Sequence, residues 1–251
     1  MMKRLLSFCL VFALGTLLAV AGEKITYRFA PELGKTFTYR ITTTSEFSNS
    51  TNESKKVETS MTTHIKATSL ENDVYTVKMS LRDLTVSLPD MPKNADTEAV
   101  FKKVNEMVSQ VTITSKIDIH GDKVGKPEFK GLPKELMGQI TAQLGQMDVS
   151  SQSTNFPKTP LGEGDTWNYN LKVAQKEIDM ECRLVKITPT SFFVTTTGNV
   201  KANKEKEGEI SVEGEIQFDR LTGQQIQSNT KIIIHENGRA SIIHEKSQLV
   251  M

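Results

Sequence analysis

Alternation of apolar and polar residues with a period of two recurs along most of this 251-residue chain, and it restricts the fold more than any other feature. Neighbouring side chains of a β-strand point to opposite faces of a sheet, so this period predicts strands with one buried face. The alternating segments are residues 37–42, 57–66, 75–82, 111–119, 167–173, 178–184 and 210–218. After Leu81 the apolar positions move by one residue to Leu84, Val86 and Leu88, which indicates a β-bulge near Asp83.

Turn-forming residues separate the predicted strands. Asn237-Gly238 is the strongest turn, because a two-residue type I′ hairpin requires positive φ at both central positions. It predicts that the strand through Ile232–Ile234 pairs with the strand through Ile242 and Ile243. Further turns are predicted at Glu71-Asn72-Asp73, His120-Gly121-Asp122 and Leu221-Thr222-Gly223.

Two segments have helical spacing instead. From Asp96, a plausible N-cap, to Gln110 the apolar residues fall at i, i+4, i+7 and i+8, namely Val100, Val104, Met107 and Val108. The segment from Pro133 to Met147 has the same spacing, with proline at the favoured first position of a helix. The sequence therefore predicts a mainly β fold, a curved antiparallel half-barrel or open barrel of about ten strands with two helices.

Two stretches of the chain resemble each other. Gly34-Lys35-Thr36-Phe37-Thr38-Tyr39 is echoed by Gly164-Asp165-Thr166-Trp167-Asn168-Tyr169, and residues 114–121 resemble residues 213–219. Two related β-meanders, in halves 22–148 and 156–251, would produce these echoes. Chance similarity between threonine-rich strands is the alternative.

The N-terminus has the order of a secretory signal peptide. Met1-Met2-Lys3-Arg4 is basic, residues 5–18 are almost all apolar, and Ala19-Val20-Ala21 supplies a small-x-small cleavage site after Ala21. The apolar run is shorter than the roughly 20 residues of a spanning helix. Gly22 occupies the place where a lipoprotein has cysteine. We therefore expect a single β-rich domain, residues 22–251, in the periplasm or outside a bacterial cell, with no lipid anchor and no later membrane-spanning helix.

Charge argues against nucleic acid as a partner. Cleavage after Ala21 lowers the count of basic residues from 31 to 29 against 30 acidic residues. There is then no excess of positive charge to bind phosphate backbones or anionic lipid surfaces.

No motif for catalysis or metal binding is present. The histidines (His64, His120, His235 and His244) have no zinc-site spacing, and the Asn-Gly hairpin places His235 opposite Ala240 and His244 opposite Lys231. Cys182 lies between Met180 and Leu184 on an apolar face, where burial makes a thiol inert. Residues 162–165 precede a strand, so we interpret them as a strand-entry turn and not as a phosphate loop. We expect a protein without catalytic residues, metal or cofactor.

The predicted sheet has more apolar surface than the helices can cover. About ten strands span roughly 48 Å, whereas two helices cover about 20 Å. The remaining apolar face must either curl onto itself or line a cavity for an apolar ligand. The candidate lining residues are the aromatic residues at the two equivalent strand starts: Phe37, Tyr39, Trp167 and Tyr169. This interpretation requires Val77, Trp167 and Cys182 to lie on the same inner side of one curved sheet.

The Gly-x-Thr-aromatic-x-Tyr openings, and the stretch Pro160-Leu161-Gly162-Glu163-Gly164-Asp165-Thr166-Trp167, resemble a family of exported bacterial β-rich proteins of unknown function. The resemblance covers most of residues 22–251 and transfers no catalytic residue. In architecture alone the chain is similar to the LolA-like lipoprotein carriers of the periplasm, which implies a curved sheet that holds acyl chains against helices.

Three function classes fit these observations to different degrees. The first is an exported, non-enzymatic protein that binds an apolar or lipid-like ligand. The alternative is a protein-interaction or structural component of the cell envelope without a small-molecule ligand. An outer-membrane β-barrel ranks below both, because aromatic residues make up only 6% of the chain, too few for two interfacial girdles.

Overall fold

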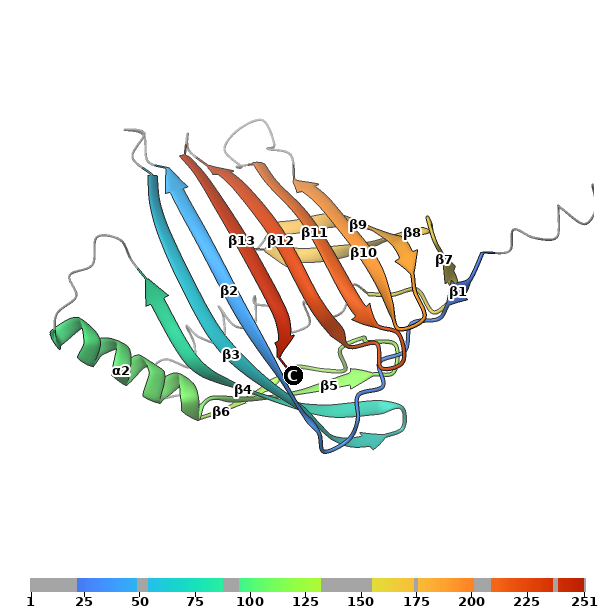
Figure 1. Ribbon diagram of the computed structural model, residues 1–251, viewed down its shortest axis with the longest axis horizontal. Coiled ribbons are helices and arrows are strands. Elements are labelled where there is room, and N and C mark those ends of the chain that lie inside the picture. The colour runs from blue at the N-terminus through green and yellow to red at the C-terminus, as the bar shows by residue number, and fades with distance from the viewer. Residues whose placement is uncertain are drawn as a thin grey trace, which may run out of the picture.

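A computed structural model of the protein describes residues 22–48, 54–87, 95–131, 155–173, 176–200, 209–236 and 239–250. Within these ranges the chain forms an eleven-stranded antiparallel sheet, a separate two-stranded sheet and one helix (Figure 1). The mainly β prediction is therefore confirmed, and the large sheet is open, with β6 and β8 at its two edges. The predicted helix at Pro133–Met147, the signal peptide and the Asn237-Gly238 turn itself lie outside the described residues.

The large sheet consists of two meanders joined side by side. The first contains β2 (Thr36–Ser48), β3 (Ser54–Glu71), β4 (Val74–Ser87), β5 (Thr112–Asp118) and β6 (Glu128–Lys130). The second contains β8 (Thr166–Val173), β9 (Lys176–Ile187), β10 (Ser191–Val200), β11 (Glu209–Asp219), β12 (Gln225–Glu236) and β13 (Arg239–Val250). Pairing of β13 with β2 joins them in the order β6-β5-β4-β3-β2-β13-β12-β11-β10-β9-β8. β1 (Lys24–Ile25) pairs with β7 (Leu161–Gly162) apart from this sheet.

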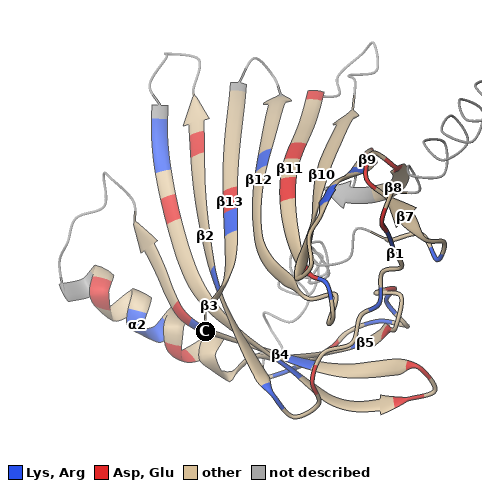
Figure 2. Ribbon diagram, turned by 45° about the vertical axis from the view of Figure 1, so that its right-hand side comes forward, with Lys and Arg blue, Asp and Glu red and all other residues tan. Residues whose placement is uncertain are grey.

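The sheet is strongly curved, with β8 and β9 turned back at one end and β4 to β6 at the other (Figures 1 and 2). We call the concave face, which carries the alternating apolar residues, the inner face. Val77, Trp167 and Cys182 belong to one buried cluster on it, which confirms that apolar side chains from both meanders meet inside a single bent sheet.

The echoed sequences occupy corresponding places in the two meanders. Gly34 and Gly164 both have positive φ, and each precedes the first strand of its meander. The N–H of Gly34 donates to Ala67 O on β3, and the N–H of Gly164 donates to Leu184 O on β9. β5 and β11 then end alike, because the carboxylates of Asp118 and Asp219 each accept two backbone N–H groups of the following turn.

A short segment between β1 and β2, residues 26–35, runs past the ends of β10 to β12 toward β4 and β5, and we call it the strap (Figure 1). Phe29 N–H donates to Ile119 O and Ala30 N–H donates to Thr222 O, both at 2.8 Å. Because Ile119 follows β5 and Thr222 follows β11, the strap connects the equivalent turns of the two meanders. It fixes the curvature of the sheet at this end.

The predicted bulge in β4 is confirmed. Asp83 has φ of 52°, and the register between β3 and β4 shifts between Ser60 and Thr62. The turn at Asn72-Asp73 also has two positive φ values, as a type I′ hairpin requires.

The helix α2 (Ala95–Gln110) has the predicted extent but a different role. β4 pairs with β5 only from Val74 to Ser80, and α2 lies beside the later part of β4, where the Asn105 side-chain amide donates to Leu84 O at 2.6 Å. The Arg82 guanidinium bonds to the carbonyl of Ser109 at the end of the helix. The expected apolar stripe is partly in solvent, since Val100 is 59% exposed. The helix therefore protects a strand edge, and the expectation that it covers the apolar face is wrong.

A candidate apolar-ligand site on the inner face

Strand register divides the inner face into three zones along the strands. At the strap end lies a filled cluster that includes Tyr27, Phe156 and Phe218, which we call the strap core. A row of mostly polar positions crosses the sheet next, and we call it the polar row: Thr196, Gly214, Thr230, Glu245, Thr43 and Thr59. Beyond it lies a third zone, the apolar field: Phe47, Val57, Tyr169, Ile178, Met180, Val200, Ile210, Val212, Ile232, Ile234 and Ile243.

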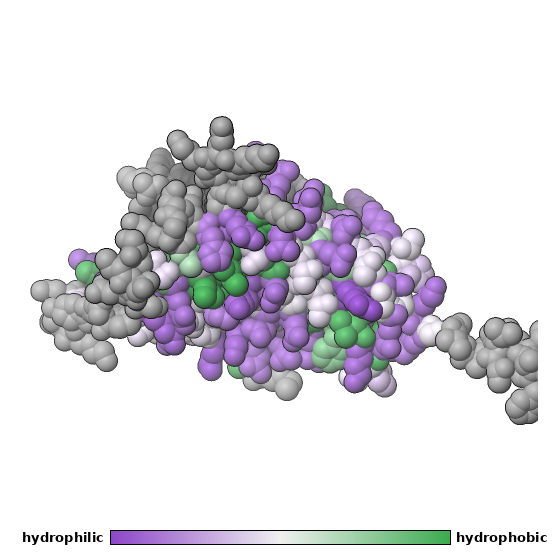
Figure 3. Space-filling model, turned by 90° about the horizontal axis from the view of Figure 1, so that it is seen from above, coloured by the Kyte–Doolittle hydropathy of each residue, from purple (hydrophilic) through white to green (hydrophobic). Residues whose placement is uncertain are grey.

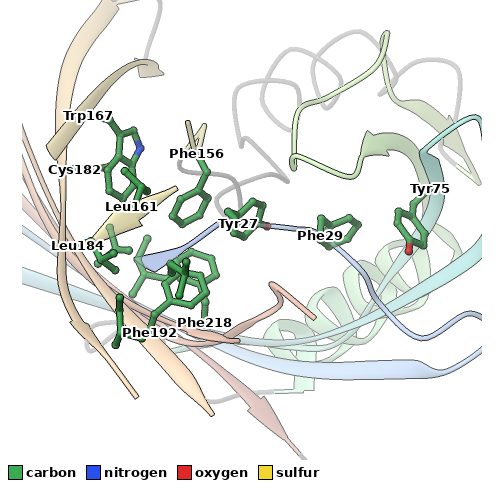
Figure 4. Close-up of a cluster of buried hydrophobic side chains, with 14 of the residues drawn as sticks. Tyr27, Phe29, Tyr75, Phe156, Leu161, Trp167, Cys182, Leu184, Phe192 and Phe218 are labelled. Atoms are coloured by element: carbon green, nitrogen blue, oxygen red, sulfur yellow. The ribbon is translucent and has the colours of Figure 1, made fainter. Parts of the chain in front are cut away.

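Aromatic rings fill the strap core (Figure 4). The Tyr27 ring stacks on Phe156 with centroids 4.0 Å apart, and Phe192 stacks on Phe218 at 5.0 Å. The Tyr27 hydroxyl donates to the Gly223 carbonyl at 3.1 Å. The neighbouring cavity lined by Phe29 and other apolar residues has a volume of about 30 Å³, the space of about one water molecule. Among the described residues this end of the inner face is closely packed, and a cavity of this size is too small for an acyl chain.

The four aromatic residues predicted as ligand contacts lie in different surroundings. Tyr39 is 1% exposed, and its hydroxyl donates to Gln225 O at 2.9 Å. Trp167 is 8% exposed and packs against Phe156. Phe37 lines the 30 Å³ cavity, whereas Tyr169 is half-buried and packs against both the strap core and the apolar field. The structure thus places Tyr39 and Trp167 in filled core and brings only Tyr169 next to the apolar field.

Burial raises the pKa of these tyrosines. Desolvation raises the pKa of Tyr39 and, together with the nearby Cys182, that of Tyr169, so both hydroxyls stay neutral donors at ordinary pH. Their role as ligand contacts remains a prediction.

The reactive residue types are placed as the sequence predicted. Cys182 is fully buried, and desolvation, with a smaller contribution from Glu181, raises the pKa of its thiol to about 12. Its environment is therefore that of a structural residue and not of a nucleophile. Asp165 accepts the N–H of Gly162 at 2.8 Å in a turn that leads into β8, which confirms the strand-entry turn.

The register of β12 and β13 confirms the predicted positions of two histidines, His235 opposite Ala240 and His244 opposite Lys231. His64 Nδ1 lies 3.0 Å from the Thr38 hydroxyl. In the described ranges, no group of three or more histidine, cysteine or acidic residues is arranged to hold a metal ion. None of the helices among the described residues is long and apolar enough to cross a bilayer.

The apolar field changes from buried to half-exposed across the sheet. On β9 and β11 its members Ile178, Met180, Ile210 and Val212 are at most 3% exposed. The Met180 sulfur lies over Gly198, where a Cβ atom would be only 2.2 Å from it. On β12, β13 and β3 the field residues are half-buried, and Phe47 on β2 is 45% exposed. This half-exposed part of the field is the apolar surface on the inner face that a ligand could cover.

The opposite, outer face carries polar and apolar side chains, among them Ile233 and Ile242, which pair across β12 and β13. It carries a hollow of about 620 Å³ over β9 to β13, whose lining mixes polar residues such as Lys186, Glu215 and Asn229 with the apolar residues Val185 and Phe193. In a different direction, from above the view of Figure 1, the visible surface is largely hydrophilic with separate hydrophobic patches (Figure 3).

No protein-family model and no curated protein matches the sequence, so the resemblance to an exported family stays a prediction. A solved structure of lipovitellin, concerned with its lipid–protein interactions, aligns with a TM-score of 0.57 and 11% identity over 88% of this chain and 25% of that chain. The chain thus spans about a quarter of the lipovitellin chain. At this identity the likeness shows the fold alone: an open, mainly β sheet of the kind found in lipovitellin.

Two further solved structures match over most of their length. They are an outer-membrane channel from Pseudomonas putida F1, with a TM-score of 0.23 at 7% identity, and a LolA superfamily protein from Nitrosomonas europaea, with a TM-score of 0.19 at 8% identity. They cover 89% and 85% of this chain, and 98% and 86% of their own chains, respectively. TM-scores this low support no structural inference.

Proposed function

We propose that this protein is an exported, non-enzymatic binder of a lipid-like ligand, whose apolar chain lies on the apolar field of the inner face. The observation that carries the proposal is the half-buried part of the field on β12, β13 and β3, next to a core that is already filled at the strap end. The likeness to the sheet of lipovitellin, whose structure concerns lipid contacts, supports it.

The size of the field fits a single chain. On β12 the field extends from Ile232 to Ile234, about 10 Å of strand, and its half-exposed part crosses the four neighbouring strands β12, β13, β2 and β3, about 14 Å at a spacing of about 4.8 Å. Each methylene group of a ligand that leaves water contributes about 0.8 kcal/mol. A chain of medium length on this surface therefore gains enough free energy for measurable binding after the cost of immobilisation.

The experiment is a binding titration with a fluorescent fatty-acyl probe that has an uncharged head group, and with the protein that begins at Gly22. The test variant replaces two inner-face residues, Ile232→Thr and Ile243→Thr, which pair across β12 and β13. The control variant, Ile233→Thr with Ile242→Thr, makes the same change on the same strands on the outer face. We expect the inner variant to bind roughly tenfold more weakly and the control to bind like wild type. Equal affinity of all three proteins, or no binding to wild type, would contradict the proposal.

Export is a separate part of the proposal. It predicts that protein expressed in a bacterium with its full N-terminus is recovered outside the cytoplasm and begins at Gly22. N-terminal sequencing tests this directly, and recovery of an intact Met1 terminus from the cytoplasm would contradict it.

A further inference from the structure

Glu245 is an acidic residue on the inner face whose neighbours on that face are uncharged. It occupies the middle of the polar row on β13, between Thr230 of β12 and Thr43 of β2. Its inner-face neighbours along and across the strands are all uncharged: Ile41, Ser45, Ser228, Ile232, Ile243 and Ser247. In the described part of the chain no hydrogen bond or ion pair reaches its carboxylate. A partly buried charge without a partner is costly, and proteins seldom retain one without a use for it.

The position of Glu245 coincides with a chemical boundary. On one side of the polar row lies the strap core, which is filled, and on the other lies the apolar field. A chain on the field that ends at the polar row would bring its head group to Glu245 and to the hydroxyls of Thr43 and Thr230. These groups offer one negative charge and several acceptor lone pairs.

The surroundings select the charge of the head group. An anionic head would meet the Glu245 carboxylate without a compensating cation, since the inner-face neighbours of Glu245 are neutral. A protonated amine would instead form a charge-assisted hydrogen bond with the carboxylate, and its other N–H groups would reach the threonine hydroxyls. Burial also raises the pKa of Glu245, which is the response of a carboxyl group that lacks a cation.

From this arrangement we infer that the ligand is a cationic amphiphile, and that its ammonium head group binds Glu245 with Thr43 and Thr230 while its chain lies on the apolar field. This inference rests on the proposed function and adds the class of head group. It assigns the polar row a role in selecting the ligand.

The test compares amphiphiles with one chain length and different head groups. Dodecylammonium, dodecyltrimethylammonium, dodecanoate and dodecyl maltoside are titrated below their micellar concentrations, with displacement of the fatty-acyl probe as the signal. Each is measured on wild type, on Glu245→Gln and on Glu215→Gln. Glu215 is an exposed carboxylate on the outer face of β11 and serves as the matched control.

Wild type should prefer dodecylammonium over dodecyl maltoside by about tenfold or more. Dodecyltrimethylammonium, which lacks N–H donors, should bind with intermediate affinity. Glu245→Gln should lose the preference but keep its affinity for dodecyl maltoside, and Glu215→Gln should behave like wild type.

The two failures are distinguishable. If all four amphiphiles bind wild type equally, or if Glu245→Gln retains the preference, the head-group inference is overturned and the apolar-ligand proposal stands. If no amphiphile binds wild type, both are overturned.

Discussion

Gly223→Ala tests the role of the strap, because this substitution should displace the strap and lower the stability of the fold. Gly223 has φ of 64°, and a Cβ atom there would lie 2.2 Å from the Arg28 carbonyl oxygen of the strap. A non-glycine residue in the left-handed region costs about 1–2 kcal/mol. The clash also displaces the strap, which loses the Ala30 hydrogen bond to Thr222 and the ring contacts of Tyr27, for about 2–3 kcal/mol more.

The matched control is Gly125→Ala. Gly125 has φ of 78°, but a Cβ atom there would meet nothing within 4 Å. Gly125→Ala should therefore lower the free energy of unfolding by only about 1–2 kcal/mol, whereas Gly223→Ala should lower it by about 3–5 kcal/mol.

Urea unfolding followed by Trp167 fluorescence measures both variants, because Trp167 is the only tryptophan of the chain. Trp167 packs on Phe156, which stacks on Tyr27 of the strap. Native Gly223→Ala should therefore also show a red-shifted emission that Gly125→Ala does not. Equal destabilisation of the two variants with unchanged emission would refute the role given to the strap.

Three further predictions concern single groups. Tyr27→Phe should lower the free energy of unfolding by about 1–2 kcal/mol, because the buried Gly223 carbonyl loses its hydrogen-bond donor. Tyr75→Phe should leave the free energy of unfolding nearly unchanged. Thermal unfolding of the two variants compares them. Cys182 should react with a thiol reagent only as fast as the protein unfolds, since it is buried with its pKa raised to about 12, and rapid labelling of native protein would contradict this. The folded-state pKa of Glu245 lies above its unfolded value, so the protonated group favours folding at low pH and this contribution is lost as pH rises through the folded pKa. The free energy of unfolding of Glu245→Gln should therefore increase relative to that of wild type as pH rises from acid to neutral. A difference between the two proteins that is constant with pH would contradict the raised pKa of Glu245.

The strands and the identity of their buried faces could be predicted from the sequence because the period of two is a local property. The same holds for the bulge at Asp83 and for the register around His235 and His244, which a two-residue turn determines. The strap also has a local signal, because its Tyr27 and Phe29 continue the alternation that begins at Ile25 of β1, and all three residues are buried. Three alternating residues are too short a run to predict a strand on their own.

The remaining features depend on contacts between distant parts of the chain. The helical spacing of α2 could not reveal that β4 extends beyond its pairing with β5 and leaves an edge for the helix to cover. The polar row combines Thr43, Thr59, Thr230 and Glu245 from four strands, and it becomes visible only when β13 is paired with β2. The burial of two of the predicted ligand contacts depends on distant residues for the same reason, since Trp167 packs against Phe156 and the Tyr39 hydroxyl donates to Gln225 O.

The most direct test of the inner-face site is a crystal structure with an acyl chain that carries a bromine atom at its end. Anomalous scattering locates the bromine independently of how the chain is traced. A single bromine peak is expected over Ile234 or Phe47, at the end of the apolar field far from the strap. A peak in the hollow over β9 to β13 on the outer face, or in the strap core, would contradict the inner-face site.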